Sequence, residues 1–556
     1  MDVSGVGATG MRAYAYELAA QLQEQSKDNI LKGKKMITEK DTICAIATGT
    51  GSAGIGIVRI SGPDAISVAE KLFRGKRRLS ELKTYTAAYG HLIRYGAAEN
   101  ERRMAGEPGD AETAKKSAVE IENKDGAGCV GSEEEILDEV IALVMRAPHT
   151  FTTEDVVELS CHGGPLVLRR VLEALVAAGA RLAEPGEFTK RAYLGGRIDL
   201  SEAEAVMDVI AAENERALDA SLRQLRGSLK KAVFELREKL LYETAFIESA
   251  LDDPENYSLD GYSDRMRAVL KECGSRIREL IDGAEEGRML RQGIRTAIVG
   301  RPNAGKSSIM NLLLGEERAI VTEIAGTTRD TLEEKAILGG VQLVLIDTAG
   351  IRETADAVEQ IGVQRAKAAV ETADLILLVI DAAEPLTEED RELLRSITGA
   401  GTDADRTESS GSSESGTESA RTAPPLLVLL NKNDLDTVVT SAELEEFEPR
   451  IKKVLEISAA TGDGRDRLSE AVQELFFSGK LSDSQEQYLL NARHKEALQE
   501  ALHALKRVEN SVDEGVGEDF YTIDLLAAYE ALGRITGETL EDDLADKIFA
   551  EFCMGK

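Results

Sequence analysis

The stretch AIVGRPNAGKSS, residues 297–308, decides the fold of the central part of the chain. Its apolar start predicts a short strand, and the residues after it predict a helix that runs to Leu314. Between them stands the pattern G-x-x-x-x-G-K-S, whose glycines let backbone N–H groups wrap phosphates. Lys306 then reaches the β- and γ-phosphates, Ser307 ligates Mg²⁺, and the helix N-terminus adds its dipole. The sequence therefore predicts a nucleoside triphosphate site on a strand–loop–helix unit.

Two segments downstream supply the rest of a phosphate and Mg²⁺ site. Asp347-Thr-Ala-Gly350 follows the apolar strand Val341–Ile346. There the carboxylate can hold Mg²⁺ through water, and the Gly350 N–H can meet the γ-phosphate. Before that strand, a segment at Thr322–Asp330 offers hydroxyl groups, from Thr327 and Thr328, that can complete the Mg²⁺ shell.

Two more segments select the base. Asn431-Lys-Asn-Asp434 follows the strand Leu426–Leu430, and Ser458-Ala459 follows the strand Val454–Ile457. The Asp434 carboxylate can accept hydrogen bonds from guanine N1–H and the 2-amino group, which adenine does not offer. The Ser458-Ala459 segment backs the guanine O6. We therefore expect the nucleotide to be GTP.

The residue after Gly350 is Ile351, where Ras-type enzymes carry a glutamine that orients the attacking water. An apolar side chain cannot do this, so a nearby carboxylate or amide must, and Glu353 and Glu359 are in reach along the chain. No basic finger is evident either. A monovalent cation could supply the missing charge, with the Asn303 side chain as a ligand.

Strand and helix alternate from Thr296 to about Phe477, which predicts an open parallel sheet. Before it, helical patterns cover Leu200–Leu251 and Asp264–Arg291, and a further helical region runs from about Asp483 to Phe552. Ser201 and Glu204 match a capping box at the start of the first helical region. Residues 41–194 mix strands and helices.

Three segments stand apart in composition. Residues 97–133 are acidic and glycine-rich, and 399–423 are low-complexity, so we interpret them as a disordered insertion and a flexible loop. Residues 1–40 form a polar, alanine-rich extension. Because Met36 directly precedes the first strand-like run, either the native start lies there or the extension is a dispensable helix.

The pattern Gly49-x-Gly51-x-x-Gly54 fits the dinucleotide-binding fingerprint literally. That fingerprint needs a helix to follow, whereas residues 56–61 are β-like. We therefore expect a hairpin or a ligand-facing loop there and no dinucleotide.

Composition excludes several classes of protein. The chain has 556 residues and a net charge of −33, so a general coating of nucleic acid is disfavoured and an RNA partner needs a local basic patch. The basic stretch Arg223, Arg226, Lys230 and Lys231 could touch RNA, but we prefer to interpret it as a solvated helix face. No apolar run is long enough to span a membrane. The five cysteines are scattered without zinc-ligand spacing, which indicates reduced thiols.

Taken together, these motifs resemble the MnmE family of tRNA uridine-modification GTPases. The resemblance covers Asp41 to Lys556 apart from the two insertions. The segments that carry it are Gly300–Ser308, Ala325–Asp330, Asp347–Gly350, Val358–Gly362, Pro185–Arg191 and Phe552–Lys556. A generic GTPase shares only the nucleotide motifs.

The resemblance implies a multidomain fold of class α/β and α. An α+β folate-binding and dimerisation domain is expected at residues 41–196. A discontinuous helical domain is expected at 197–292 and 482–556, with a Ras-like P-loop α/β GTPase domain inserted at 293–481.

Carried over residue by residue, the resemblance implies a potassium-stimulated GTPase. Glu359 orients the attacking water and joins Lys306 as catalytic. Mg²⁺ is held by Ser307 and Thr328, and K⁺ by Asn303, Thr322, Ile324 and Thr327. The GTP-binding set is Asn303, Ala304, Gly305, Lys306, Ser307, Ser308, Thr322, Glu323, Ile324, Ala325, Gly326, Thr327, Thr328, Asp347, Thr348, Ala349, Gly350, Asn431, Lys432, Asp434, Ser458 and Ala459.

The resemblance also implies a folate site at Arg59, Glu158, Arg197 and Lys556. Its ligand is 5,10-methylenetetrahydrofolate, with 5-formyltetrahydrofolate as an analogue. A carboxylate suits the pterin's donor edge and cations suit the glutamate tail. Arg197 stands where some family members have lysine. Cys553 lies beside this pocket in the family pattern, either as a catalytic thiol or as a buried structural one.

The implied reaction adds an aminomethyl-type group at C5 of the wobble uridine, U34, of certain tRNAs in the cytoplasm. The implied assembly is a homodimer that joins an FAD-dependent MnmG-type partner in a heterotetramer. Two rival interpretations remain: a ribosome-assembly GTPase, for which the tail is acidic where a basic appendage is expected, and a GTP-gated scaffold, which needs no folate.

Overall fold

The computed structural model describes residues 41–49, 51–95, 134–315, 333–346, 370, 372–398, 424–439, 443–444, 447, 450–477, 488–538, 549 and 555. Their contacts divide the chain into two compact units. The first comprises residues 1–207, 233–260 and 517–556, and the second comprises 208–232 and 261–516. The helices that we expected to form one discontinuous domain are thus shared between the two units. Of the helices described, none has both the length and the apolar character to cross a membrane.

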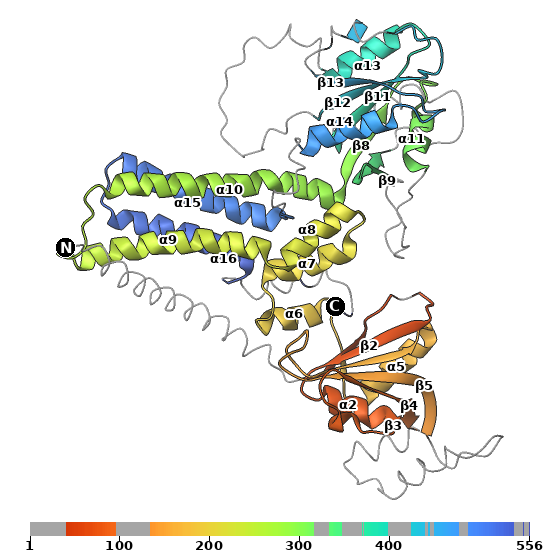
Figure 1. Ribbon diagram of the computed structural model, residues 1–556, viewed down its shortest axis with the longest axis vertical. Coiled ribbons are helices and arrows are strands. Elements are labelled where there is room, and N and C mark those ends of the chain that lie inside the picture. The colour runs from red at the N-terminus through yellow and green to blue at the C-terminus, as the bar shows by residue number, and fades with distance from the viewer. Residues whose placement is uncertain are drawn as a thin grey trace, which may run out of the picture. The chain divides into compact units, whose positions relative to one another are not determined.

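A seven-stranded sheet with strand order β3-β4-β5-β6-β2-β1-β7 forms the core of the first unit (Figure 1). All its neighbouring pairs are antiparallel except β1 with β7. The strands are β1 (Ile43–Ile46), β2 (Ile55–Ser61), β3 (Phe73–Gly75), β4 (Thr86–Tyr95), β5 (Glu134–Met145), β6 (Val156–His162) and β7 (Arg181–Leu182).

Two helices, α2 (Ala65–Leu72) and α5 (Pro165–Ala177), pack on one face of this sheet. Side chains alternate between the two faces along β2. Val58 and Ile60 are buried beneath the helices, whereas Ile57 and Arg59 point to the other face. On that other face, Phe188 packs against Ile43 and Ala45 at the β1 end. The part of the face formed by β4, β5 and β6 is called the open face below. Because β2 follows the glycine-rich loop at once, the prediction that no dinucleotide-binding helix stands there is confirmed.

The segment Pro185–Arg191 forms the start of α6 (Glu187–Leu194), and its charges tie three parts of the first unit together. The Glu187 carboxylate accepts hydrogen bonds from Arg181, Arg191 and the Glu184 N–H. Burial alone would raise the pKa of Glu187, but these bonds outweigh it and lower the pKa. Arg191 also reaches Asp41, just before β1. This network seats Phe188, which is fully buried, beneath Arg59.

The first unit continues into α7 (Leu200–Ala211), and one local prediction there is wrong. The capping box is made by Asp199 and Glu202, not by Ser201 and Glu204. The Asp199 N–H donates to Glu202 Oε2 at 2.7 Å, and the Glu202 N–H donates to Asp199 Oδ1 at 2.8 Å. Aspartate is as good an N-cap as serine, and it stands directly before the helix.

Helices account for much of the remaining chain in both units. In the first unit, α9 (Ser228–Asp252) contacts α16 (Asp519–Thr536), where Arg237 lies 4.0 Å above the Tyr529 ring. In the second unit, α10 (Tyr262–Gln292) and α15 (Ala492–Asp513) lie side by side (Figure 1). The Arg267–Asp513 pair, at 3.2 Å, joins the start of α10 to the end of α15, so the two run antiparallel. A shorter helix, α8 (Glu215–Leu225), also packs on α10.

The second unit holds a six-stranded sheet with order β13-β12-β11-β8-β10-β9. Its strands are β8 (Ile294–Val299), β9 (Glu333–Leu338), β10 (Val341–Ile346), β11 (Leu375–Asp381), β12 (Leu426–Asn431) and β13 (Ile451–Glu456). The prediction of a parallel sheet is correct for every pair but one, because β9 joins the edge antiparallel to β10. A two-glycine turn, too short for a crossover, forces this antiparallel hairpin.

Helices cover both faces of this sheet. On one face, α11 (Lys306–Leu314) and α14 (Arg465–Phe477) share a core with alternate residues of the strands, such as Ile298 and Leu377. On the other, α13 (Glu388–Thr398) packs on Ile376 and Leu378. Both faces of the central strands are therefore buried, which explains their almost continuous apolar sequences.

Candidate functional site: a guanine nucleotide pocket

The loop between β8 and α11 has the backbone that a phosphate cradle needs. Asn303 and Gly305 take positive φ angles of 64° and 101°, while Ala304 between them is buried. A Cβ on Gly305 would come within 2.1 Å of Asn431 Nδ2, so only glycine fits here. The predicted phosphate loop is thus packed directly against the predicted base-recognition segment.

Lys306 folds back over the loop that it follows. Its Nζ donates to the carbonyl oxygens of Gly300 and Arg301, both at 2.8 Å. This arrangement holds the ammonium group inside the curve of the loop, where the β- and γ-phosphates of a nucleotide would lie. Ser307 and Ser308 are exposed on the first turn of α11, whose N-terminus faces the same space.

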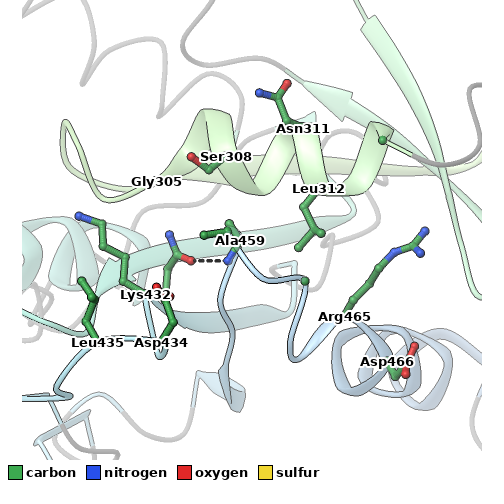
Figure 2. Close-up of a pocket in the computed structure, with 14 residues that line it drawn as sticks. Gly305, Ser308, Asn311, Leu312, Lys432, Asp434, Leu435, Ala459, Arg465 and Asp466 are labelled. Carbon is green, nitrogen blue, oxygen red and sulfur yellow. Dashed lines mark hydrogen bonds between the residues drawn. The ribbon is translucent and has the colours of Figure 1, made fainter.

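Asn431, at the end of β12, joins the phosphate end of the pocket to the base end. Its Nδ2 donates to the Ala304 carbonyl at 3.0 Å, and its Oδ1 accepts from the Ala459 N–H at 3.1 Å, the dashed line in Figure 2. One buried side chain therefore fixes the loop before α11 and the loop after β13 relative to each other.

The two residues expected to contact the base are themselves held in place. Asp434 accepts a hydrogen bond from the Ser458 hydroxyl at 2.6 Å. Lys432, with φ 68°, pairs through Nζ with Asp381 at 2.6 Å. Figure 2 shows Lys432, Asp434 and Leu435 gathered at one end of the pocket, across from Gly305 and Ser308. Lys432, Asp434, Ser458 and Ala459 therefore lie together, as the sequence motifs predict.

A cavity of about 770 Å³, within the usual range of small-molecule sites, is lined by six of the predicted residues: Gly305, Ser308, Asn431, Lys432, Asp434 and Ala459. Motif analysis did not predict several of its lining residues, which come from α11, from the loop before α14 and from the first turn of α14: Asn311, Leu312, Gly462, Arg465 and Asp466. These residues belong to no nucleotide-binding motif, because only the packing of α11 and α14 brings them to the pocket. Their one signal in the sequence is their position a few residues beyond the two motifs.

Arg301 is the cation within the phosphate loop, and it is engaged away from the cavity. Its guanidinium donates to Glu384 and lies 3.5 Å from Asp390 and 4.0 Å from Asp381. Because three carboxylates surround it, Arg301 does not act as a basic finger on the nucleotide. The positive charge that a basic finger would supply therefore still needs another source, and the monovalent cation stays our prediction for it.

The remaining predicted GTP and metal residues lie outside the described residues, and so does Glu359. They are Thr322, Glu323, Ile324, Ala325, Gly326, Thr327, Thr328, Asp347, Thr348, Ala349 and Gly350. The strands that lead to them are described: β10 ends at Ile346, directly before Asp347.

Three of the four predicted folate residues gather in the first unit. Arg59 on β2 pairs with Glu158 on β6, which stands opposite it in the sheet, at 2.8 Å. The Arg59 guanidinium lies 5.9 Å from the centre of the Phe151 ring, and that of Arg197 lies 5.2 Å from it. Arg197 also donates to the Thr150 carbonyl. One aromatic ring is therefore shared by two cations, beside a half-buried carboxylate.

The C-terminal end of the chain approaches this part of the first unit. Phe549 packs with Leu200 and Ala203. A Cβ on Gly555 would come within 2.2 Å of the Ile46 carbonyl oxygen, at the end of β1. Lys556 and Cys553 lie outside the described residues. Burial raises the pKa of the Cys44 thiol to about 11 and that of Cys161 to about 12, so neither is a nucleophile at neutral pH.

Comparisons with known proteins agree on one family. A family model described as the MnmE helical domain matches residues 200–553, and one described as the N-terminus of the GTP-binding protein TrmE matches 42–197. The tRNA modification GTPase MnmE of Lachnoclostridium phytofermentans is 47% identical over 519 residues, which are 93% of this chain and 99% of that protein. The chain belongs to the MnmE family.

A second MnmE, from Enterococcus faecalis, is 40% identical over 520 residues, 93% of this chain and 99% of its own. Among solved structures, the G domain of the T. maritima FeoB iron transporter is 23% identical, with 33% of this chain and 97% of that one covered at a TM-score of 0.22. Membership of the MnmE family makes the chain a multidomain GTP hydrolase. It also sets aside the ribosome-assembly GTPase.

Proposed function

We propose that this MnmE-family GTPase takes part in modifying the wobble uridine, U34, of certain tRNAs. With an FAD-containing partner of the MnmG type, it installs an aminomethyl-type group at C5, and 5,10-methylenetetrahydrofolate supplies the carbon. Its curated relatives are named tRNA modification GTPases and match over almost their whole length, which supports this assignment. Turnover of GTP provides the conformational drive, with K⁺ and Mg²⁺ at the nucleotide.

The described geometry supports part of the roles proposed at the nucleotide site, and the remaining roles rest on the family resemblance. The loop N–H groups and Lys306 bind the phosphates, and Asn431 fixes their distance from the base. Asp434 reads guanine with its free carboxylate oxygen, since Ser458 holds the other one. Exposed Ser307 suits Mg²⁺, together with Thr328. Exposed Asn303, with Thr322, Ile324 and Thr327, suits K⁺, whose charge would stabilise the negative charge that develops on hydrolysis.

The proposed folate site has a donor set that fits a pterin glutamate. Glu158 can accept hydrogen bonds from the donor edge of the ring, and Arg59 and Arg197 can bind carboxylates. Phe151, between the two arginines, offers an apolar surface for a flat ring system. Gly555, the residue before Lys556, lies close to the Ile46 carbonyl at the end of β1, in the same sheet as Arg59, which supports including Lys556 in the proposed site.

The proposed homodimer would use the open face of the first sheet. Tyr89 on β4 and Ile141 on β5 stand opposite each other there, with exposed fractions of 60% and 49%. Ile57 lies two strands further along the same row. Adjacent exposed apolar side chains on a sheet favour a protein partner, and a second copy of this face offers a matching apolar row. The dimer would then join the FAD-containing partner in a heterotetramer, and the tRNA would bind to that assembly.

The observation that carries the nucleotide part of the proposal is the Asn431 bridge between phosphate loop and base loop. Its test is GTP turnover by the full chain in matched K⁺ and Na⁺ buffers. We expect K⁺ to raise the turnover number by roughly tenfold or more, and Glu359→Ala to remove about 10²-fold or more of it. Glu353→Ala, the neighbouring carboxylate, should keep the K⁺ response. Equal rates in both salts would exclude the potassium mechanism.

The folate part has its own test, because a GTP-gated scaffold needs no one-carbon donor. Titration of 5-formyltetrahydrofolate into the purified chain should show saturable binding, which Arg59→Ala weakens while GTP turnover stays unchanged. A chain that hydrolyses GTP normally and does not bind the folate would favour the scaffold.

A further inference from the structure

The antiparallel hairpin β9–β10 connects the two proposed nucleotide-sensing segments. Residues 322–330 come shortly before β9, and Asp347 directly follows β10. The strands are joined by Gly339-Gly340, with φ angles of 59° and 76°, as a tight two-residue turn requires. Gln473 on α14 donates to the Gly339 carbonyl at 2.8 Å, so the tip of the hairpin is held. A change at the nucleotide end of either strand is therefore transmitted along a short, stiff element.

Glu213 contacts both strands of this hairpin. One carboxylate oxygen accepts from Lys335 Nζ on β9 at 2.6 Å, and the other accepts from Gln342 Nε2 on β10 at 2.7 Å. Glu213 does not belong to the nucleotide-binding domain, because it stands in the turn between α7 and α8. Its carboxylate therefore bridges two strands that are neighbours in the sheet from a segment more than a hundred residues away.

The contact is built into a cavity of about 340 Å³ beneath α10. Gln342 is only 3% exposed, and its Oε1 finds no hydrogen-bond partner among the described residues. Burying a side-chain amide costs desolvation free energy that its hydrogen bonds must offset. For Gln342, the bond from Nε2 to Glu213 provides this compensation. A glutamine held in this way loses its partner if the hairpin moves relative to the turn.

The turn itself is fixed to α10. Asn214 caps α8 and donates through Nδ2 to the Leu290 carbonyl at 3.1 Å. Arg291 pairs with Asp208 at 3.4 Å. Since α10 continues through Gly293 into β8, the turn and the root of the phosphate loop share one support. If the hairpin moves relative to α10, the hydrogen bonds from Lys335 and Gln342 to Glu213 must lengthen or break.

We propose that Glu213 is a positioning residue that couples the nucleotide state to the α7–α8 turn through the β9–β10 hairpin. The inference rests on the proposed function, in which residues 322–328 supply ligands of Mg²⁺ and K⁺ at the nucleotide, and on the expected contact of Gly350 with the γ-phosphate. A nucleotide shifts an equilibrium only through contacts that differ between two states. The pair of bonds at Glu213 is such a contact, and the coupling is reciprocal: releasing it changes the preference of the site for GTP over GDP.

The test uses the full chain with GDP and with a non-hydrolysable GTP analogue. Hydrogen–deuterium exchange is followed in peptides that cover the α7–α8 turn and, separately, the phosphate loop. The variant is Glu213→Ala. The matched control is Glu474→Ala, which removes the Lys453–Glu474 pair, of similar length at 2.7 Å, between α14 and β13, the edge strand opposite β9. Equal melting temperatures of the two variants would show that both fold.

In the wild-type chain and in Glu474→Ala, exchange at the turn is expected to differ between the two nucleotides. In Glu213→Ala that difference should be lost, and the ratio of the GDP and GTP-analogue dissociation constants should change by roughly two- to fivefold. The charge-reversed double variant E213K/K335E should restore the difference, because the new ammonium group can donate to Gln342 Oε1.

Either of two results would overturn the coupling: a turn that responds to the nucleotide equally in Glu213→Ala, or one that does not respond in the wild-type chain. Failure of the proposed function has another signature. The phosphate loop would then show no protection by either nucleotide, in any variant, and the inference would fall with it.

Discussion

Asp381 is a carboxylate at the end of β11, 3% exposed, that serves the nucleotide site without lining it. It accepts from Lys432 Nζ at 2.6 Å and from the Ala383 N–H at 3.1 Å. Lys432 lines the base end of the cavity with a backbone conformation that favours glycine, so its side chain depends on this anchor. At the scale of single residues, base recognition thus depends on the group behind the lysine as well as on the lysine.

Asp381→Asn tests this anchor. The substitution keeps the shape and weakens the bond to Lys432 by about 1–2 kcal/mol, so the dissociation constants of GTP and GDP should rise by roughly five- to thirtyfold. The turnover number should stay near the wild-type value, since no reacting group is touched. Fluorescent-nucleotide titration and steady-state kinetics measure the two separately.

Asp390→Asn is the control, because Asp390 is equally buried and, like Asp381, lies near Arg301. It caps α13 through Thr387 and does not contact Lys432. It should cost stability and leave affinity unchanged. If both variants weakened nucleotide binding alike, Asp381 would be a structural residue only.

At the scale of the elements, the turn of the β9–β10 hairpin requires two neighbouring glycines, Gly339 and Gly340. A Cβ on Gly339 would stand 2.0 Å from Ser469 Oγ and 2.5 Å from Gln473 Nε2, both on α14. A Cβ on Gly340 would meet nothing nearer than Arg216 Nε at 3.7 Å. Both positions have positive φ, so either substitution costs about 1 kcal/mol of backbone strain, and Gly339 adds the clash.

We therefore expect Gly340→Ala to destabilise the nucleotide-binding domain by about 1 kcal/mol and Gly339→Ala by about 2–4 kcal/mol. Thermal unfolding measures both, and the relevant transition is the one that GDP shifts to higher temperature. Equal shifts of that transition in the two variants would contradict the packing of the hairpin tip on α14.

An element can be predicted from the sequence when local residue pattern determines it, and not when contacts with distant residues determine it. Strands such as β11 and β12 are nearly all apolar, and their bounds follow from local pattern. The capping box at α7 was misplaced by two residues because several polar residues there are competent caps. The antiparallel β9 was missed because EEKAIL fits several structures and only the glycine turn decides.

The candidate site divides in the same way. The phosphate and base motifs are local, so Lys306, Asn431 and Asp434 were found from residue spacing. The Arg59–Glu158 pair joins residues 99 positions apart, and Glu213 is 122 residues from Lys335. No local pattern encodes such pairs. The first came from family resemblance, and the second from the fold alone.

At the scale of the whole molecule, the proposed homodimer would use the open face of the first sheet. Ile141→Asp places a charge in the middle of the exposed apolar row, where a dimer would bury it without a partner. Light scattering at matched concentrations should then find the wild-type chain as the proposed dimer and the variant as a monomer.

Leu166→Asp is the matched control, because Leu166 is 58% exposed on α5, which packs on the other face of the sheet. It should remain dimeric. A dimer that survives Ile141→Asp would move the interface elsewhere.

The 31-residue α10 has one more consequence, which is mechanical. At 1.5 Å per residue it is about 46 Å long, and its last residue is separated from β8 by Gly293 alone. The strand then leads within six residues to the phosphate loop. A helix of this length can act as a lever whose short arm is at the nucleotide. A tilt of about 10° at Gly293 would move the far end of α10 by roughly 8 Å. With α15 laid antiparallel along it, the lever is double and resists bending, so a small rotation of β8 about Gly293 would be carried to the far end of α10 as a displacement the size of a side chain.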